Sequence, residues 1–215
     1  MPDAKISALT AVTTAAGADE FAVNQAATSK KATLTQITGF VHARSGVFNA
    51  SVTTPAAGFA ADTYLAGSSC LIPASGLKAA SMYRCKFNVV KTAAGVAAPI
   101  INVRFGTAGT VADVSRGILT FSAQTAAIDE GVFEVFGTFR TVGAGTAAVL
   151  QTLGTLRHRL SITGLGVGVS EPEIATSAGF DSTVASSIIG LSVNGGASAA
   201  WTIALVQAEL FNLAA

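Results

Sequence analysis

The chain has 215 residues, which fits one β-sandwich of ordinary size with a smaller appendage better than two equal domains. Its 13 basic and 12 acidic residues leave a net charge of +1, without the clustered Lys and Arg that nucleic acids or anionic membranes require of a partner. Only 12% of the residues are charged and half are hydrophobic, so we expect a homo-oligomer that hides part of a charge-poor surface.

The N-terminal residues do not have the pattern of a targeting segment. Asp3 and Lys5 stand where a signal peptide would need a basic start followed by an apolar run, and no apolar stretch approaches the roughly 18 residues of a membrane span. We therefore expect a chain that is cytosolic when it is made.

Residues 1–45 differ from the rest of the chain. A short strand at Phe21–Val23, a turn over residues 24–29 and a second segment from Lys30 to Leu34 indicate a small hairpin, which is too little to fold alone. We expect an arm that docks on something else. By composition alone, a tail that is disordered or packed on the main domain is an equal alternative.

The motifs of this arm resemble a known kind of N-terminal segment. KISALT, GADEFAV and SKKATLTQI, spread between Lys5 and Ile37, are similar to the segment that precedes a fibre or decoration domain in many virion proteins of tailed bacteriophages. One departure is Phe21-Ala22-Val23, where that family often carries a proline. The resemblance implies an attachment arm, with these apolar residues contacting the partner: Ile6, Leu9, Phe21, Val23, Leu34 and Ile37.

From Val47 onward the chain consists of short apolar segments joined by Gly, Asn, Pro or Asp, the residues that supply turn conformations. No segment keeps an apolar period of 3.6 with a helix cap, which argues against an α/β fold. Ten or so antiparallel strands are too many for one open sheet, so residues 46–215 are predicted to form an all-β, antiparallel, jelly-roll-like β-sandwich. The predicted strands are Val47–Val52, Tyr64–Ala66, Met82–Val90, Pro99–Phe105, Gly117–Phe121, Val132–Arg140, Ala148–Leu153, Leu156–Thr163, Ser187–Val193 and Trp201–Phe211.

The clearest alternation lies in Met82–Lys91, which predicts a half-buried strand with every second side chain in the core. Phe136 breaks the pattern of its own strand by pointing outward, and the segment from Trp201 to Val206 is apolar on both faces. We expect a subunit interface at Phe136 and Trp201; the alternative is that a loop or the second sheet covers them. The predicted inward residues are Tyr83, Cys85, Phe87, Val89, Ile101, Val103, Phe105, Phe133, Val135 and Phe139.

The sequence offers little for catalysis. His158 alternates with Leu156 and Leu160 and has no nucleophile motif beside it, which favours a structural or interfacial histidine over a general base; His42 carries no signal. We expect no enzymatic activity. The four arginines Arg104, Arg140, Arg157 and Arg159 are interpreted as a strip that keeps one exposed sheet face wet, or that pairs with an acidic neighbour.

Two acidic pairs, Asp129 with Glu130 and Glu171 with Glu173, are predicted to be solvated turn residues rather than a glycosidase pair or a calcium site. The glycine-rich segment 143–148 matches the letters of a dinucleotide fingerprint, but it joins two predicted strands instead of a strand and a helix, so a hairpin turn is expected. A loop is expected at Gly164, Gly166 and Gly168.

Cys70 and Cys85 are the two cysteines of the chain. Two thiols without a CxxC spacing or clustered histidines do not make a zinc site, and buried free thiols are favoured over a single bridge. We expect no metal and no cofactor.

Phrases in the body, at residues 64–68, 92–95, 103–107 and 131–135, are similar to phage head-fibre, decoration or tail-fibre proteins. The resemblance implies a virion structural protein: a trimeric capsid decoration (cement) or head-fibre protein whose arm docks on the major capsid protein or another virion protein. It would be assembled in the host cytoplasm, with no nucleic acid or membrane partner. The alternative is a tail-fibre or receptor-binding module that recognises host surface glycans; a depolymerase is the least favoured reading.

Overall fold

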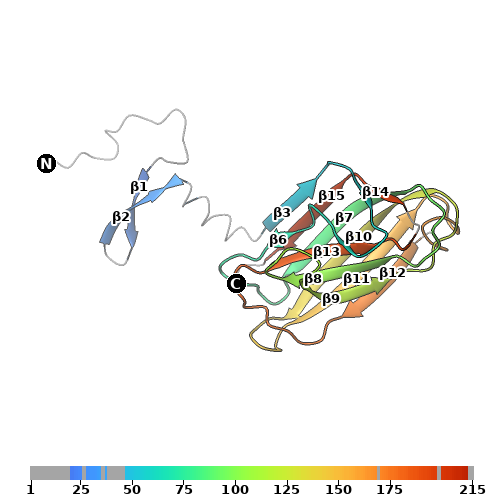
Figure 1. The fold of residues 1–215 in the computed structure, drawn as a ribbon. Coiled ribbons are helices and arrows are strands. Elements are labelled where there is room, and N and C mark those ends of the chain that lie inside the picture. The colour runs from blue at the N-terminus through green and yellow to red at the C-terminus, as the bar shows by residue number, and fades with distance from the viewer. Residues whose placement is uncertain are drawn as a thin grey trace. The chain divides into compact units, whose positions relative to one another are not determined.

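The computed structural model describes residues 20–25, 28–34, 37, 47–168, 170–197 and 200–212. The chain divides into two compact units, Met1–Ser45 and Gly46–Ala215 (Figure 1). Within the described residues, no helix has the length and apolarity needed to cross a bilayer.

The first unit contains an antiparallel pair of strands, β1 (Glu20–Gln25) and β2 (Thr28–Thr33). Glu20 pairs with Thr33 and Gln25 pairs with Thr28, so the connection between the strands is short. This is the hairpin that the sequence predicts, with each strand slightly longer than expected.

The second unit consists of two antiparallel sheets, which together form an all-β sandwich (Figure 1). The large sheet has eight strands: β3 (Val47–Val52), β4 (Ala56–Gly58), β7 (Met82–Lys91), β10 (Asp129–Thr141), β11 (Val149–His158), β12 (Ser170–Thr176), β14 (Trp201–Ile203) and β15 (Val206–Phe211). The small sheet has five strands: β5 (Thr63–Tyr64), β6 (Cys70–Leu71), β8 (Ile100–Gly106), β9 (Val114–Thr120) and β13 (Ile188–Asn194).

The strand order is that of a jelly roll. Three positions are each split into two short strands: β3 with β4, β5 with β6, and β14 with β15. Counted in this way, the large sheet runs first, eighth, third, sixth (β3/β4, β14/β15, β7, β10) and the small sheet runs second, seventh, fourth, fifth (β5/β6, β13, β8, β9). β11 and β12 are an added hairpin that widens the large sheet beyond β10. The predicted jelly-roll-like sandwich is therefore confirmed.

The break between β14 and β15 has a local cause. The side chain of Asn88 on β7 accepts hydrogen bonds from the backbone N–H groups of Ala204 (3.0 Å) and Leu205 (2.7 Å). These donors would otherwise be unpaired where the strand leaves its register. β14 and β15 consequently both pair with β7, on either side of the irregularity.

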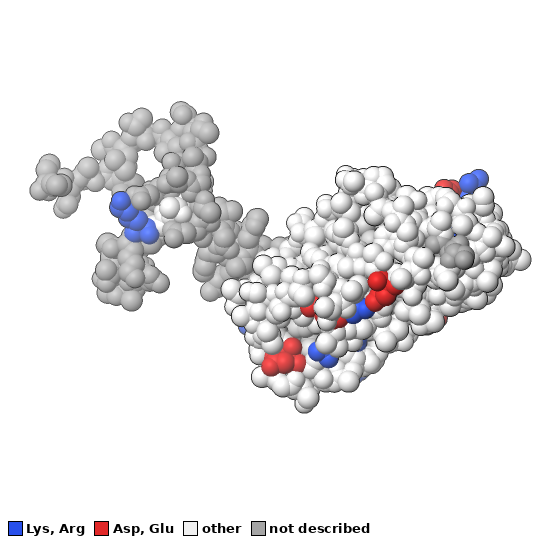
Figure 2. Space-filling view, viewed as in Figure 1, with Lys and Arg blue, Asp and Glu red and all other residues white. Residues whose placement is uncertain are grey.

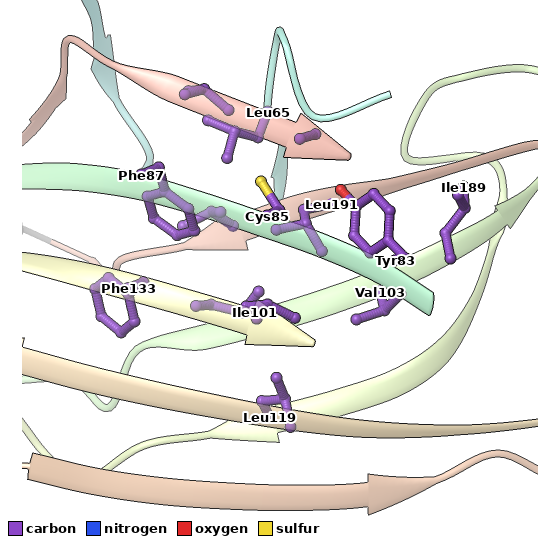
Figure 3. Close-up of a cluster of buried hydrophobic side chains, with 14 of the residues drawn as sticks. Leu65, Tyr83, Cys85, Phe87, Ile101, Val103, Leu119, Phe133, Ile189 and Leu191 are labelled. Atoms are coloured by element: carbon purple, nitrogen blue, oxygen red, sulfur yellow. The ribbon is translucent and has the colours of Figure 1, made fainter. Parts of the chain in front are cut away.

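The core lies between the two sheets, and the alternation of β7 accounts for its centre. Tyr83, Cys85, Phe87 and Val89 are at most 1% exposed, as predicted. Figure 3 shows the first three of them among the buried side chains. Phe87 stacks on Phe133 of the neighbouring strand with ring centroids 5.3 Å apart. The other predicted inward residues are also buried: Ile101, Val103, Phe105, Val135 and Phe139.

Two strand predictions in the added hairpin are corrected. The two predicted strands 148–153 and 156–163 are replaced by one continuous strand, β11 (Val149–His158), which passes through Gly154, while residues 159–163 belong to the connection that follows it. Glycine is suited at 154 because a Cβ would come within 2.7 Å of Leu119 Cδ1 on the other sheet. β12 was not predicted, since Glu171-Pro172-Glu173 has the composition of a turn. The strand forms because its outward-facing residues other than Pro172 have side chains that favour strands. The backbone of β11 also pairs with its backbone.

Candidate functional site

The predicted arm residues are only partly described. Ile6 and Leu9 lie outside the described residues, and so does His42. Phe21 and Val23 lie on β1, where they pair with Ala32 and Lys30 of β2. Leu34 and Ile37 are half-buried.

Trp201 does not lie on a subunit surface. Its side chain is fully buried in the sandwich, tilted against Phe133 at 5.6 Å, and its indole Nε1 donates to Gln124 Oε1 at 3.0 Å. This corrects the predicted interface role and fits the alternative of cover by a loop, because the loop residues Gln124 and Gly195 lie against the indole.

Phe136 points away from the core as predicted, and it begins an apolar row across the large sheet. Phe136 pairs with Leu153 on β11, which pairs with Ile174 on β12. Their exposed fractions are 36%, 38% and 67%. The row lines a shallow hollow of about 290 Å³. At the Phe136 end of the row, the guanidinium of Arg84 lies 5.5 Å from the centre of the Phe136 ring.

The outer face around this row is uncharged over residues 151–155 and 172–176 of the added hairpin, with Arg157 beyond them on β11. Its outward residues from Gln151 to Thr155 and from Pro172 to Thr176 are all uncharged. On the side shown in Figure 2, too, acidic and basic side chains occupy only a few places on the sandwich. A surface of this kind has little to oppose its burial against another protein.

The edge strand β12 is protected against further strand pairing. Pro172 has no N–H to donate, and Glu171 and Glu173 flank it. Proline and charged side chains are common on strands that must not pair with other chains. An interface here would use the face of the sheet rather than its edge.

The end of the sandwich opposite Val47 holds a buried ionisable cluster. Val47 pairs with Phe211, which pairs with Met82, whereas Lys91 at the far end of β7 pairs with Asp129. There, Asp129 Oδ2 lies 2.6 Å from His158 Nδ1, and both side chains are fully buried.

His158 is held by acceptors at both ring nitrogens. Nε2 lies 2.7 Å from the carbonyl oxygen of Gly168, which can only accept, so Nε2 carries a proton. Nδ1 lies 2.6 Å from Asp129 Oδ2. The ring has no free nitrogen for a substrate, and this fits the predicted structural role.

Lys91 completes this cluster. It is fully buried, and its Nζ donates to the carbonyl oxygens of Thr125 (2.5 Å) and Ala127 (3.0 Å). Burial lowers the pKa of Lys91, and the nearby charge of Asp129 acts in the opposite direction. The lysine thus ties the connection before β10 to the core.

The acidic pairs are not solvated turn residues, which corrects the prediction. Asp129 is buried at the start of β10, and Glu130 forms an exposed ion pair with Arg159 at 3.1 Å. Glu171 and Glu173 lie on β12. Both carboxylate oxygens of Glu171 accept hydrogen bonds, from Ser122 N and Oγ and from the N–H groups of Val167 and Gly168.

The predicted arginine strip does not form. Arg104 lies on β8 in the small sheet, is only 9% exposed, and pairs with Asp62. Its Nη1 also donates to the carbonyl oxygens of Val111 and Asp113. Arg140 and Arg157 lie on β10 and β11, in the other sheet.

Cys70 and Cys85 are free and buried, as favoured from the sequence. The segment 143–148 joins β10 to β11 as a turn, with Gly143 and Gly145 at positive φ, and Gly164, Gly166 and Gly168 lie in the connection from β11 to β12. In the described part of the chain, no group of three His, Cys, Asp or Glu side chains could hold a metal ion.

No family model matches the chain, and no curated protein matches it. The CBM2 module of the evolved Dit of Lactobacillus casei BL23 phage J-1 is 15% identical, with a TM-score of 0.34 over 68% of this chain and 70% of that one. Protein SO2946 of unknown function from Shewanella oneidensis MR-1 is 10% identical, with a TM-score of 0.33 over 77% and 78%. Scores this low assign neither fold nor function.

Some of the site residues that were not predicted could have been found from the alternation of their strands. Lys91 and Asp129 have the inward parity of Val89 and Phe133 on their strands, so strict alternation places both in the core. Ile174 had no such signal, because its strand was not predicted.

Proposed function

We propose that this chain is a structural protein of a tailed-phage virion: a trimeric capsid decoration or head-fibre protein that docks through residues 1–45. One observation carries the proposal. The β1–β2 hairpin belongs to a unit separate from the jelly roll, and the part of that unit that the structure describes holds a two-stranded sheet, which by itself is marginally stable in water. Such a hairpin gains stability by binding a partner, and its motifs are those that resemble phage attachment arms.

The proposal includes a homo-oligomer and assigns no enzymatic activity. The uncharged outer face with the row Phe136–Leu153–Ile174 supports a subunit surface, since contiguous exposed apolar residues are costly on a monomer. A protein that binds the assembled shell and not its free subunits stabilises the shell by mass action.

Recognition of host glycans is less well supported. Glycan sites usually present exposed aromatic rings, but Tyr83 and Trp201 are fully buried and Tyr64 is half-buried. The exposed Phe136 ring is partly covered by Arg84.

The test is immunogold electron microscopy of the virion whose genome carries this gene. Label on the capsid supports the proposal, label on the tail supports the glycan-binding alternative, and unlabelled virions overturn both. Cosedimentation of the full chain with capsids lacking it then tests the arm. Phe21→Asp combined with Leu34→Asp is expected to abolish binding, whereas the polar control Gln25→Ala is expected to retain it.

A further inference from the structure

The connection Arg159–Gly168 between β11 and β12 combines exposed and buried aliphatic side chains. Leu160, Ile162 and Val167 are 38%, 69% and 55% exposed, but Leu165 is fully buried. Leu165 packs over Gly131 of β10, where a Cβ would come within 2.9 Å of Leu165 Cδ1. We call the connection Arg159–Gly168 the strap. Leu165 is the residue that anchors it in the core by an apolar contact.

A carboxylate on β12 holds the last part of this strap. Glu171 Oε1 accepts hydrogen bonds from Val167 N at 2.8 Å, Gly168 N at 3.0 Å and Ser122 Oγ at 2.6 Å, and Oε2 accepts from Ser122 N at 3.1 Å. All four donors converge on one ionised group, an arrangement that depends on its negative charge.

Further contacts hold the middle of the strap. Leu165 N donates to Asp129 Oδ2 at 3.1 Å, and Gly164 N donates to Thr125 Oγ1 at 2.6 Å. His158 Nε2 donates to Gly168 O. These contacts place the strap over the buried cluster at this end of the sandwich.

The closed strap is locally strained. Ser161 has φ of +64°, and Ile162 N donates to Leu160 O at 2.7 Å across it. This is a tight turn with a non-glycine residue at positive φ, which is unfavourable and is kept only while the surroundings hold it. Loss of the anchors would let this turn relax.

We propose that the strap Arg159–Gly168 is released by acid: it stays closed while Glu171 is ionised, and protonation of Glu171 opens it and uncovers Leu165. A protonated carboxyl carries an O–H donor and loses acceptor capacity, so it cannot satisfy four converging donors. This proposal goes beyond the virion role and does not depend on it.

The direction of the pH effect follows from the hydrogen bonds. Burial alone raises the pKa of Glu171, but the hydrogen bonds from Ser122, Val167 and Gly168 outweigh burial and hold the pKa below its ordinary value. The anchor therefore acts in full above the pKa of the unfolded chain, and is lost as the pH falls through the lowered pKa.

The other charged groups around the strap have their own partners or lie beside it. Asp129 pairs with His158 at 2.6 Å. The others are Lys91, which is bound to carbonyls, Glu130, which is paired with Arg159, Arg157 on the outer face of β11, and Glu173, two residues after Glu171.

The test is amide hydrogen exchange of the full chain, resolved by residue and divided by intrinsic rates at about pH 7 and about pH 3. In the wild type, protection of the Val167 and Gly168 amides is expected to fall by about tenfold or more in acid. Amides in the middle of β7 serve as the reference that should stay protected. Glu171→Gln is expected to lose the Val167 and Gly168 protection at both pH values.

Glu173→Gln is the matched control and is expected to behave as the wild type does. If Glu171→Gln does not fold, Ser122→Ala removes the Oγ donor to Glu171 and also the Oγ that accepts from Val167 N at 3.2 Å, so its opening is followed at the Gly168 amide and is expected at higher pH. The proposal is overturned if the Val167 and Gly168 amides of the wild type remain protected in acid while the β7 amides are also protected. It is overturned equally if Glu171→Gln shows the same pH response as the wild type, or if Glu173→Gln does not show that response.

Discussion

Trp201 and Gln124 form a hydrogen bond in the interior of the sandwich, with the indole Nε1 donating to the amide oxygen at 3.0 Å. The amide nitrogen of the same glutamine donates to Ala97 O at 2.9 Å and to Gly195 O at 2.6 Å. One buried side chain therefore joins the tryptophan of β14 to two loops at the same end of the molecule.

Replacement of this glutamine should be costly. Gln124→Leu keeps similar volume but leaves the Trp201 N–H and two carbonyl oxygens without partners, so the free energy of unfolding is expected to fall by about 3 kcal/mol. Urea denaturation followed by the fluorescence of the single tryptophan measures the change. Gln151→Leu, at an exposed position on β11, should stay within about 0.5 kcal/mol of the wild type. Equal losses in both variants would contradict this role for Gln124.

Sequence alternation predicted the part of the fold in which each strand has one apolar and one polar face. The core residues of β7, β8 and β10 follow from parity alone, since period 2 fixes the face of each side chain. The jelly-roll class followed from the number of such strands.

The rest depended on which strands become neighbours, which alternation does not specify. Trp201 looked like an interface residue because its segment is apolar on both faces. Its place on β14 between β7 and β4 of the large sheet depends on pairing with strands that are distant in sequence. The row Phe136–Leu153–Ile174 likewise arises from the registers of three strands. The burial of Arg104 requires the loop 107–113 to fold over the small sheet.

Arg104 should be sensitive even to a conservative change. Its guanidinium donates to Ser192 Oγ, to two loop carbonyls and to Asp62, and a lysine has no planar fork to reach all of them. Arg104→Lys is expected to lower the free energy of unfolding by about 2 kcal/mol and to speed hydrogen exchange in residues 107–113. Arg140→Lys, on the exposed end of β10, is the control. Unchanged exchange in that loop would mean that Arg104 does not hold it.

The two cysteines should be inert in the folded protein. Burial raises the pKa of Cys70 to about 12, with a smaller contribution from Glu209, and burial also raises that of Cys85 to about 12. Since the thiolate is the reactive form, a thiol reagent at about pH 8 should label neither residue in the native state. In denaturant it should label both. Labelling of one native thiol would indicate local opening, and none in denaturant would indicate a bridge.

The subunit surface proposed on the large sheet predicts which substitutions change the oligomeric state. If the row at Ile174 is buried between subunits, Ile174→Asp places a charge in an apolar contact and should dissociate the oligomer without lowering stability much, because the side chain is 67% exposed within one chain. Light scattering should give the wild type a mass three times the 21.5 kDa of one chain, and the variant the mass of a single chain.

Ile118→Asp is the matched control, since Ile118 is 58% exposed but lies on β9 of the small sheet. It should leave the mass unchanged, because a surface aspartate on a face that no subunit covers meets only water. A wild type that is monomeric at high concentration would contradict the proposed oligomer itself. Dissociation by Ile118→Asp but not by Ile174→Asp would instead place the contact on the small sheet, where the added hairpin β11–β12 takes no part.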